Sequence, residues 1–315
     1  MVETRPAPAQ AAERPAPALV ELKQVSRWYG DVVAVNDVTM TIGPGVTGLL
    51  GPNGAGKSTL LHIMSGFLAP SAGTATLNGE RIWRNHEIYR LIGLVPEREG
   101  VYGFLTGWQF VLSSARLHRL PDPEEAARRA LATVEMTAAK DRRIETYSKG
   151  MRQRVKVAAA LVHDPRVLLL DEPLNGLDPD GIRWVRELLR GLAAQGRTVF
   201  VSSHLLNEVE HTAERVVVIG HGRLIATGAI ADLLGRTAVL RVTAADPVET
   251  AELATALAWA GGRVEPDGDG LTARGLAAET AGRIALDRGI ALRELATHVR
   301  GLEETFHALA HGGAA

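Results

Sequence analysis

The sequence predicts an α/β fold with a mixed sheet at its core, followed by a smaller α+β unit. Three features predict this fold. Short apolar runs alternate with segments of helical periodicity, which is typical of a parallel sheet covered on both faces. A glycine-rich turn joins one such run, residues 46–50, to a segment at 60–67 that can be helical. After about residue 235 the runs become shorter and follow a different order, which indicates a second domain.

Composition narrows the class of protein. The chain has 315 residues, room for about two domains. Its formal net charge of −1 gives no electrostatic reason to expect a nucleic-acid partner. It has no cysteine, which excludes disulfides and thiolate metal sites and fits a reducing compartment. No apolar run reaches the roughly 18 residues of a membrane span, and residues 1–18 are Ala/Pro-rich, so we expect a disordered tail there rather than a signal.

Strands are expected on both sides of the glycine-rich turn. Residues 20–23 and 38–42 read as strands that flank a turn at Gly30-Asp31. Tyr29 precedes that turn, where its ring could stack on an adenine, although a half-buried tyrosine at a strand end is at least as common. Further strands are expected at 74–77 and at 91–95, the second ending at Pro96-Glu97.

Helical periodicity dominates residues 100–162, with helices expected at 108–117, 122–139 and 148–162. Asp122 and Pro123 supply the N-cap and the first-turn proline of the second helix. The elements expected after this region are then, in chain order, an apolar strand at 167–170, a helix at 180–194, and strands at 198–202 and 216–219.

The glycine-rich turn matches the pattern G-x-x-x-x-G-K-S/T. Its members are Gly51, Pro52, Asn53, Gly54, Ala55, Gly56, Lys57, Ser58 and Thr59. Between a strand and a helix, such a loop points backbone N–H groups at phosphate oxygens, and the helix N-terminus favours the anion. Lys57 would reach the β- and γ-phosphates, and the Ser58 hydroxyl would bind Mg²⁺. A loop that merely turns the chain is the weaker interpretation, because both flanks and the Lys-Ser pair are in register.

Two carboxylates, Asp171 and Glu172, follow the apolar strand at 167–170. A carboxylate at this place positions Mg²⁺ in nucleoside-triphosphate sites, and the next one can take a proton from attacking water. A solvated acidic loop is the alternative, disfavoured by the four apolar residues before it. His204 ends another core strand, where parallel sheets bind ligands, although a lone histidine is more often a surface or packed residue.

These motifs together resemble the nucleotide-binding subunit of an ABC transporter over about residues 19–235. They are, in order, GPNGAGKST at 51–59, YSKGMRQR at 147–154, LLLDEP at 168–173, NGLD at 175–178 and SSH at 202–204. A phosphate loop alone would fit kinases, GTPases or helicases. The serine-glycine signature about 20 residues before the Asp-Glu pair is specific to the ABC family. The resemblance implies a P-loop NTPase fold with a helical subdomain at about 100–162.

The resemblance also implies roles for single residues. Tyr29 would stack on the adenine of ATP, and residues 51–59 would hold its phosphates and Mg²⁺. Asp171 would support the metal through water, Glu172 would be the catalytic base, and His204 would contact the γ-phosphate and the attacking water.

A second set of residues would act across a dimer. By resemblance, Ser148 and Gly150, at a helix N-terminus, contact the γ-phosphate bound by the opposite subunit, and Asp178 lines the interface. Each site would then need two chains, identical or different. ATP would join them and hydrolysis would release them.

Two departures from the family pattern stand out. Glu97 occupies the place of a glutamine that usually contacts Mg²⁺; its carboxylate could still bind the metal but adds a negative charge. Tyr147, Lys149 and Met151 replace usual signature residues. Both variants resemble the branch that serves drug, antibiotic and sodium exporters with separate membrane subunits. The resemblance thus implies an integral membrane permease as partner and a place on the cytoplasmic face of the membrane.

The docking groove would lie near residues 97–108, where the apolar run 101–105 could face the permease or form ordinary core. A soluble ABC-type ATPase acting on ribosomes or DNA is the alternative, but it would usually carry two ATPase units or a coiled-coil insertion. A non-catalytic regulator is disfavoured by the intact Lys57, Asp171, Glu172 and His204.

Residues 237–311 predict an accessory ferredoxin-like domain of order βαββαβ. Its expected strands are 239–242, 262–264, 271–273 and 291–295, and its expected helices are 248–260, 277–287 and 302–309. The stretch 301–306 resembles the end of an accessory domain in the same branch.

Overall fold

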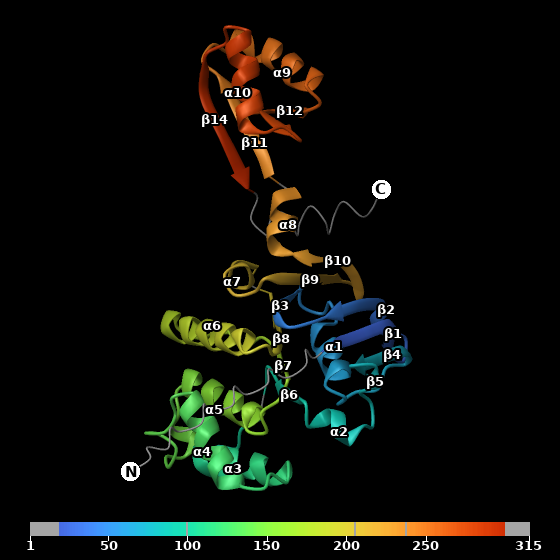
Figure 1. The fold of residues 1–315 in the computed structure, drawn as a ribbon, viewed down its shortest axis with the longest axis vertical. Helices are drawn as coiled ribbons and strands as arrows, with labels where there is room; N and C mark the ends of the chain where they lie inside the picture. The colour runs from blue at the N-terminus through green and yellow to red at the C-terminus, as the bar shows by residue number, and fades with distance from the viewer. Residues whose placement is uncertain (1–18, 99, 205, 237, 300–315) are drawn as a thin grey trace, which may run out of the picture. The chain divides into compact units, whose positions relative to one another are not determined.

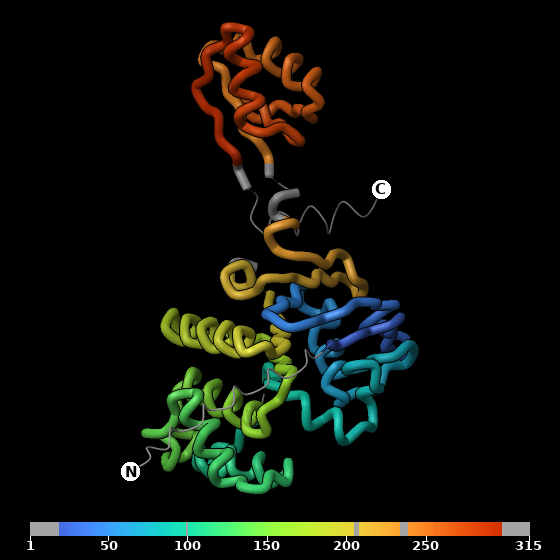
Figure 2. Tube along the Cα trace, in the orientation of Figure 1, coloured from blue at the N-terminus to red at the C-terminus, as the bar shows by residue number. Residues whose placement is uncertain are grey.

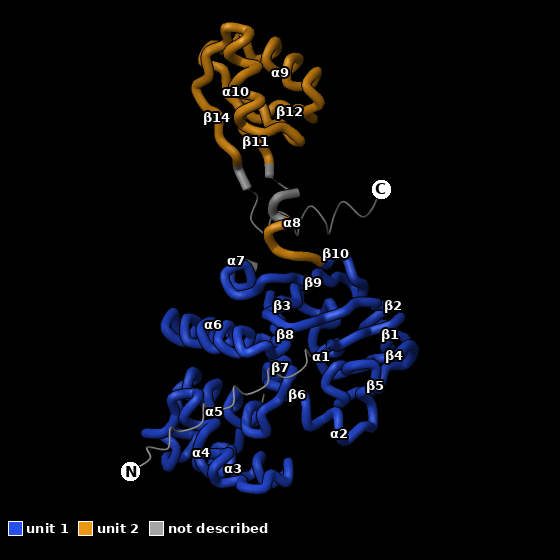
Figure 3. Tube along the Cα trace, in the orientation of Figure 1, with its two compact units in different colours: residues 1–227 blue, residues 228–315 orange. Residues whose placement is uncertain are grey.

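The computed structural model describes residues 19–98, 100–204, 206–236 and 238–299. The expected disordered tail at 1–18 and the expected helix at 302–309 lie outside these residues. The chain divides into two compact units, residues 1–227 and 228–315 (Figure 3). The sequence placed the end of the first domain at residue 235, whereas the units divide within the last strand of the first unit's sheet. Among the described residues, no helix combines the length and apolar composition needed to cross a membrane.

The central sheet of the first unit has six strands. They are β3 Gly45–Leu50, β6 Ile92–Val95, β7 Val167–Leu170, β8 Thr198–Ser203, β9 Arg215–Gly220 and β10 Arg223–Ala229. Their order across the sheet is β10-β9-β3-β8-β7-β6. The pairs β9·β3, β3·β8, β8·β7 and β7·β6 are parallel. The carboxyl ends of these strands therefore share one edge of the sheet.

A second sheet completes this unit. Its strands are β1 Val20–Tyr29, β2 Val32–Ile42, β4 Ala72–Leu77 and β5 Glu80–Arg81. They pair antiparallel in the order β2-β1-β4-β5. β1 and β2 form one long hairpin around the expected turn, where Gly30 has a positive φ of 56°.

Helices cover the central sheet and form a separate group beside it (Figure 1). The helices of this unit are α1 Lys57–Met64, α2 His86–Tyr89, α3 Gly107–Leu117, α4 Pro123–Thr133, α5 Lys149–Leu161, α6 Pro179–Ala194 and α7 Leu206–Glu210. α3, α4 and α5 pack on one another, and α6 packs on β3 and β8. α4 ends earlier than the helix expected at 122–139, because Glu135 adopts a left-handed φ of 58° that a helix cannot continue.

Apolar residues of the central strands pack on both faces of the sheet. Along β7, Leu168 and Leu170 join a core cluster with α3 to α6, while Val167 and Leu169 join a cluster with α1 and the second sheet. Successive side chains of a strand point to opposite faces. A strand buried on both faces therefore reads as an unbroken apolar run, as residues 167–170 do.

The first helix of the second unit is α8 Ile230–Arg236, and the unit continues as an α+β body (Figure 2). Its further elements are β11 Ala238–Ala244, α9 Thr250–Trp259, β12 Arg263–Asp267, β13 Gly270–Arg274, α10 Ala278–Asp287 and β14 Leu292–Val299. The sheet order is β12-β13-β11-β14, with antiparallel pairs throughout. The element order is the βαββαβ that the sequence predicted. The core of this body is a separate cluster that includes Leu240, Val242 and Leu257.

Candidate functional site

Three neighbouring parallel strands bring the predicted site residues to one edge of the central sheet. β8 lies between β3 and β7. Leu50 is in register with Ser203, and Leu170 is in register with Val201. The segments that follow these strands are the glycine-rich loop, the Asp-Glu pair and His204. Sequence-distant segments therefore converge because the strands are parallel and adjacent.

The glycine-rich loop passes directly into α1, whose N-cap is Gly56. Gly56 has φ of 99°, a conformation that L side chains rarely adopt, and a Cβ there would collide with the carbonyl oxygen of Ala34. No side chain caps this helix. Its first N–H groups are thus oriented toward the loop, as an anion site at a helix N-terminus requires.

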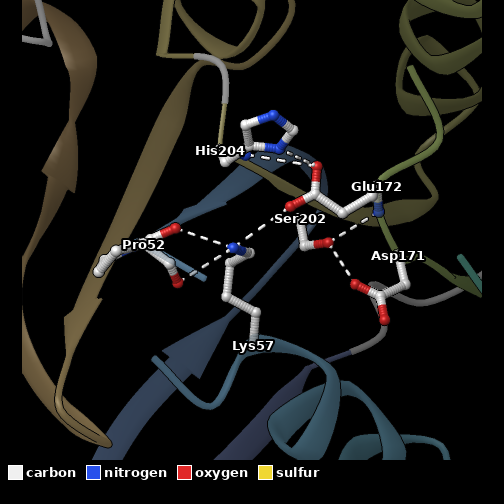
Figure 4. Close-up of polar contacts among 7 residues, drawn as sticks. Pro52, Lys57, Asp171, Glu172, Ser202 and His204 are labelled. Atoms are coloured by element: carbon white, nitrogen blue, oxygen red, sulfur yellow. Dashed lines mark hydrogen bonds and ion pairs between the residues drawn. The ribbon is translucent and has the colours of Figure 1, made fainter. Parts of the chain in front are cut away.

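Lys57 reaches back over this loop. Its Nζ donates hydrogen bonds to the carbonyl oxygens of Gly51 at 2.8 Å and Pro52 at 3.4 Å. It also forms an ion pair with Glu172, with 3.2 Å between Nζ and Oε1 (Figure 4). Both side chains are buried, at 7 % and 8 % exposure. The lysine ammonium and the second carboxylate of the Asp-Glu pair therefore already meet across the site.

Glu172 is held on its other side by His204. The Nδ1 atom of His204 lies 2.8 Å from Oε2 of Glu172. The backbone of Glu172 has a positive φ of 47°, which is uncommon for a residue other than glycine. Such strain persists only where the surroundings determine the conformation, and it is concentrated at functional sites.

Ser202 lies in the SSH motif, but the sequence analysis gave it no role. Its hydroxyl donates to Oδ1 of Asp171 at 2.6 Å and accepts from the backbone N–H of Glu172 at 2.8 Å (Figure 4). Ser202 and Asp171 are both buried. The one hydroxyl thus positions both carboxylate residues. The only signal in the sequence is a serine, rather than an apolar residue, near the end of a buried strand.

A cavity of about 580 Å³ opens over this arrangement. Its lining comes from β2, from the glycine-rich loop and from the segments that follow β6, β7 and β8: Ala34, Pro52, Asn53, Gly54, Gly56, Lys57, Ser58, Thr59, Glu97, Arg98, Glu172, Asn175 and His204. Most of the predicted phosphate and metal residues therefore face one space. Ala34, Arg98 and Asn175 are lining residues that the sequence analysis did not select.

Other predicted residues lie away from this lining. Tyr29 is half exposed at the end of β1, and the guanidinium of Arg27 lies 4.7 Å from its ring centroid. Ser148 is the N-cap of α5 and accepts from the N–H of Met151 at 3.2 Å. Asp178 likewise caps α6. The roles of these residues in nucleotide stacking and at a dimer interface remain predictions.

The oxygen-bearing side chains at this edge of the sheet suit a hard divalent cation bound together with phosphate. No group of three or more His, Asp or Glu side chains that could hold a metal occurs among the described residues. Ser58 and Glu97 line the cavity, and Asp171 lies behind it at the end of β7. One or two carboxylates with substrate phosphates and water are the usual ligands of Mg²⁺, so these oxygen donors fit that ion.

Similarity to known proteins agrees with this geometry. The family model described as ABC transporter matches residues 35–175. The bacitracin transport ATP-binding protein of Enterococcus faecalis is 37 % identical over 218 residues, 68 % of this chain and 70 % of the relative. The Nod factor export ATP-binding protein I of Paraburkholderia xenovorans is 36 % identical over 246 residues, 73 % of this chain and 78 % of the relative.

Solved structures of ABC transporter subunits superpose on this chain. The cbiO1 protein of Clostridium perfringens, described as part of an ABC transporter complex, superposes with a TM-score of 0.61 at 29 % identity, covering 67 % of this chain and 88 % of that one. A bacterial ABC transporter cassette described as dimeric gives 0.61 at 25 % identity, covering 67 % and 98 %.

Fold and site together define a P-loop ATPase of the cassette type. The chain belongs to the family of ABC transporter ATP-binding proteins. As a member of this family it binds and hydrolyses ATP as the energy-supplying subunit of a transporter.

Proposed function

We propose that this chain powers export through a separate membrane permease, and that ATP is bound and hydrolysed at the edge formed by β3, β7 and β8. The observation that carries the proposal is the convergence of Lys57, Glu172 and His204 on one cavity. The direction of transport follows the relative that is named for Nod factor export.

The phosphates would bind in the glycine-rich loop. Backbone N–H groups of residues 51–59 and the start of α1 would receive their oxygens, and Lys57 would bind the β- and γ-phosphates. The Ser58 hydroxyl and the Asp171 and Glu97 carboxylates would hold Mg²⁺. The ion would neutralise charge on the phosphates during transfer.

Glu172 would act as the general base of hydrolysis. Water attacks the γ-phosphorus, the bond to the bridging oxygen of ADP breaks, and the water proton passes to the Glu172 carboxylate. A positioned base contributes about 10²–10⁴-fold. His204 holds one carboxylate oxygen at 2.8 Å, and Ser202 fixes the backbone N–H, so the base is oriented by two separate contacts.

The complete site would require a second ATP-binding subunit, identical or different. Ser148 and Gly150 lie at the start of α5, where N–H groups and the helix dipole favour an anion. We assign them to the γ-phosphate of the partner chain, and Asp178 to the interface. Tyr29 would stack on the adenine with one ring face, since Arg27 lies over the ring.

The permease would dock beside β6 and the α3–α5 group, which would place the chain on the cytoplasmic face of the membrane. A cavity of about 320 Å³ opens there between the end of β6, α3 and α5; Pro96, Phe110 and Lys156 are among its lining residues. Tyr102 and Phe104 are 61 % and 69 % exposed, and the ring of Tyr102 contacts those of Phe104 and Phe110. Such exposed aromatic rings suit a protein interface.

The experiment compares Glu172→Gln with the exposed control Glu125→Gln. Glu172→Gln should bind ATP, lose hydrolysis by about 10²–10⁴-fold and accumulate as an ATP-dependent dimer on a sizing column. Glu125→Gln should behave as wild type. A monomeric, fully active Glu172→Gln variant would refute the proposal. Co-purification from membranes, followed by mass spectrometry, should identify the permease; recovery with ribosomes or DNA instead would support the alternative function.

A further inference from the structure

A second cavity, of about 280 Å³, adjoins the catalytic one. The two share part of their lining, namely Glu97, Arg98, Glu172 and Asn175. The remaining lining of the second cavity comes from α5 and the loop after β6: Val101, Lys149, Arg152, Gln153 and Lys156. A ligand in this space would therefore lie next to the catalytic base and against the first turns of α5. We refer to it as the α5 cavity.

The α5 cavity has an excess of positive charge. Its cationic side chains outnumber its carboxylates, with Arg98, Lys149, Arg152 and Lys156 against Glu97 and Glu172. Two of these cations have N–H donors left over after their hydrogen bonds to the described residues. Lys156 donates to the carbonyl oxygens of Pro96 at 2.9 Å and Glu97 at 3.2 Å, although an ammonium has three N–H donors. Arg152 uses one nitrogen to donate to the carbonyl of Tyr147 at 2.7 Å.

Gln153 supplies an independent sign of a ligand. It lines the cavity, is 8 % exposed, and its amide Nε2 has no acceptor among the described residues. Buried donors are normally paired, because an unmade hydrogen bond costs the full desolvation of the group. Because the Gln153 side chain lines the cavity, rotation of its terminal amide would bring Nε2 to a ligand rich in acceptor oxygens.

The positions of two lysines point the same way. Lys149 and Lys156 both line the α5 cavity, so an anion bound there would reduce the repulsion between two charges of the same sign. The volume is ample for an ion of the size of phosphate and too small for a second nucleotide.

We propose that the α5 cavity is an anion subsite that receives inorganic phosphate released by hydrolysis beside Glu172. This inference rests on the proposed function, because Glu172 must generate the phosphate next to the opening. The contacts would be charge-assisted hydrogen bonds from Lys149, Lys156 and the Gln153 amide. Phosphate would thus leave the catalytic cavity along α5 while the nucleotide remains in the glycine-rich loop.

The test measures binding of inorganic phosphate to the full chain by titration calorimetry, alone and with a non-hydrolysable ATP analogue at saturation. The analogue fills the γ-phosphate position, so any remaining phosphate binding reports another site. Wild type should bind phosphate in both conditions. The double variant Lys149→Gln/Lys156→Gln should bind it about tenfold more weakly than wild type in both conditions. Gln153→Met, similar in size but without the donor, should also bind phosphate more weakly while melting no lower than wild type.

Lys23→Gln, which changes an exposed side chain of β1, is the matched control for removal of a positive charge. It should bind phosphate as wild type does. Equal phosphate affinity in wild type and in the double variant would overturn the subsite, as would the absence of phosphate binding once the analogue is present. Failure of the analogue itself to bind would refute the nucleotide site, while the comparison with phosphate alone would still decide the subsite.

Single-turnover kinetics with a fluorescent reporter of free phosphate measures when product phosphate leaves the protein. In wild type, appearance of free phosphate should lag behind cleavage of ATP. The lag should shorten in the double variant and persist in Lys23→Gln. Identical lags in all three proteins would show that product phosphate does not pass through the α5 cavity.

Discussion

Lys57 and Glu172 form a buried ion pair, with Nζ 3.2 Å from Oε1, that joins the start of α1 to the end of β7. The lysine that is assigned to the phosphates and the carboxylate that is assigned to water therefore neutralise each other. A γ-phosphate that binds Lys57 competes with Glu172 for the same ammonium group. We infer that nucleotide binding frees Glu172 from Lys57 and leaves His204 as its remaining partner.

The first prediction concerns the energy of this pair. Lys57→Ala and Glu172→Ala each leave a buried charge without its partner, at a cost of about 3 kcal/mol. The double variant should cost less than the sum by about 1–3 kcal/mol in urea unfolding. The exposed pair Arg128–Glu125 serves as control, with a coupling below about 1 kcal/mol. Strict additivity at Lys57 and Glu172 would show that the pair does not form in solution.

The second prediction concerns Ser202. Ser202→Ala removes the hydroxyl between Asp171 and Glu172 and should destabilise the protein by about 1–3 kcal/mol, because two buried polar groups lose a partner. It should also lower kcat more than it raises KM for ATP, because the base is no longer oriented. Ser113→Ala, which removes a hydroxyl on the surface of α3, is the control for both measurements. An active, fully stable Ser202→Ala variant would show that the hydroxyl between Asp171 and Glu172 contributes neither to stability nor to catalysis.

The third prediction concerns pH. The rings of His118 and His163 stack with centroids 3.8 Å apart, and burial lowers the pKa of His163 from 6.5 to about 4. The folded state thus keeps His163 neutral, while the unfolded chain binds a proton below pH 6.5. The neutral His163 therefore contributes its full share of stability above pH 6.5. The free energy of unfolding falls by up to about 3 kcal/mol as the pH falls toward 4.

Urea unfolding measured between pH 4 and pH 6.5 checks the direction of this change in stability. His163→Gln can still donate to the carbonyl of Ile92, the partner of the histidine Nε2 at 3.1 Å, but does not titrate. Its stability should therefore fall less steeply with acid than that of wild type. Parallel curves would mean that His163 takes up its proton over the same pH range in the folded protein as in the unfolded chain.

The fourth prediction concerns the boundary between the two units. The site residues all lie before residue 227, and the second unit has its own core. A chain ending at residue 236 should therefore fold and bind ATP with wild-type affinity, as measured by titration calorimetry. A shorter chain that ends at residue 222, before β10, should lose stability because it removes an edge strand of the central sheet. Loss of ATP binding in the longer chain would place part of the nucleotide site in the second unit.

Local patterns predicted the elements that carry the site. The unbroken apolar run at 167–170 indicated a strand buried on both faces, and β7 has that environment. The glycine-rich pattern predicted where a strand passes into a helix, and α1 begins at Lys57. The early end of α4 was not predictable in this way, because the left-handed turn at Glu135 carries no glycine.

The sequence by itself determined most strands and helices of the first unit and the residues that follow β3, β6, β7 and β8, because hydrophobic periodicity and turn residues act over short distances along the chain. It did not predict the short elements β5, α2 and α7 or the edge strand β10. Only the tertiary structure decided which of those residues meet. Lys57 pairs with Glu172, and Ser202 bridges Asp171 to the backbone of Glu172, because β3, β8 and β7 are adjacent and parallel. Such contacts depend on the order of strands across a sheet, which long-range packing sets and which no local pattern encodes.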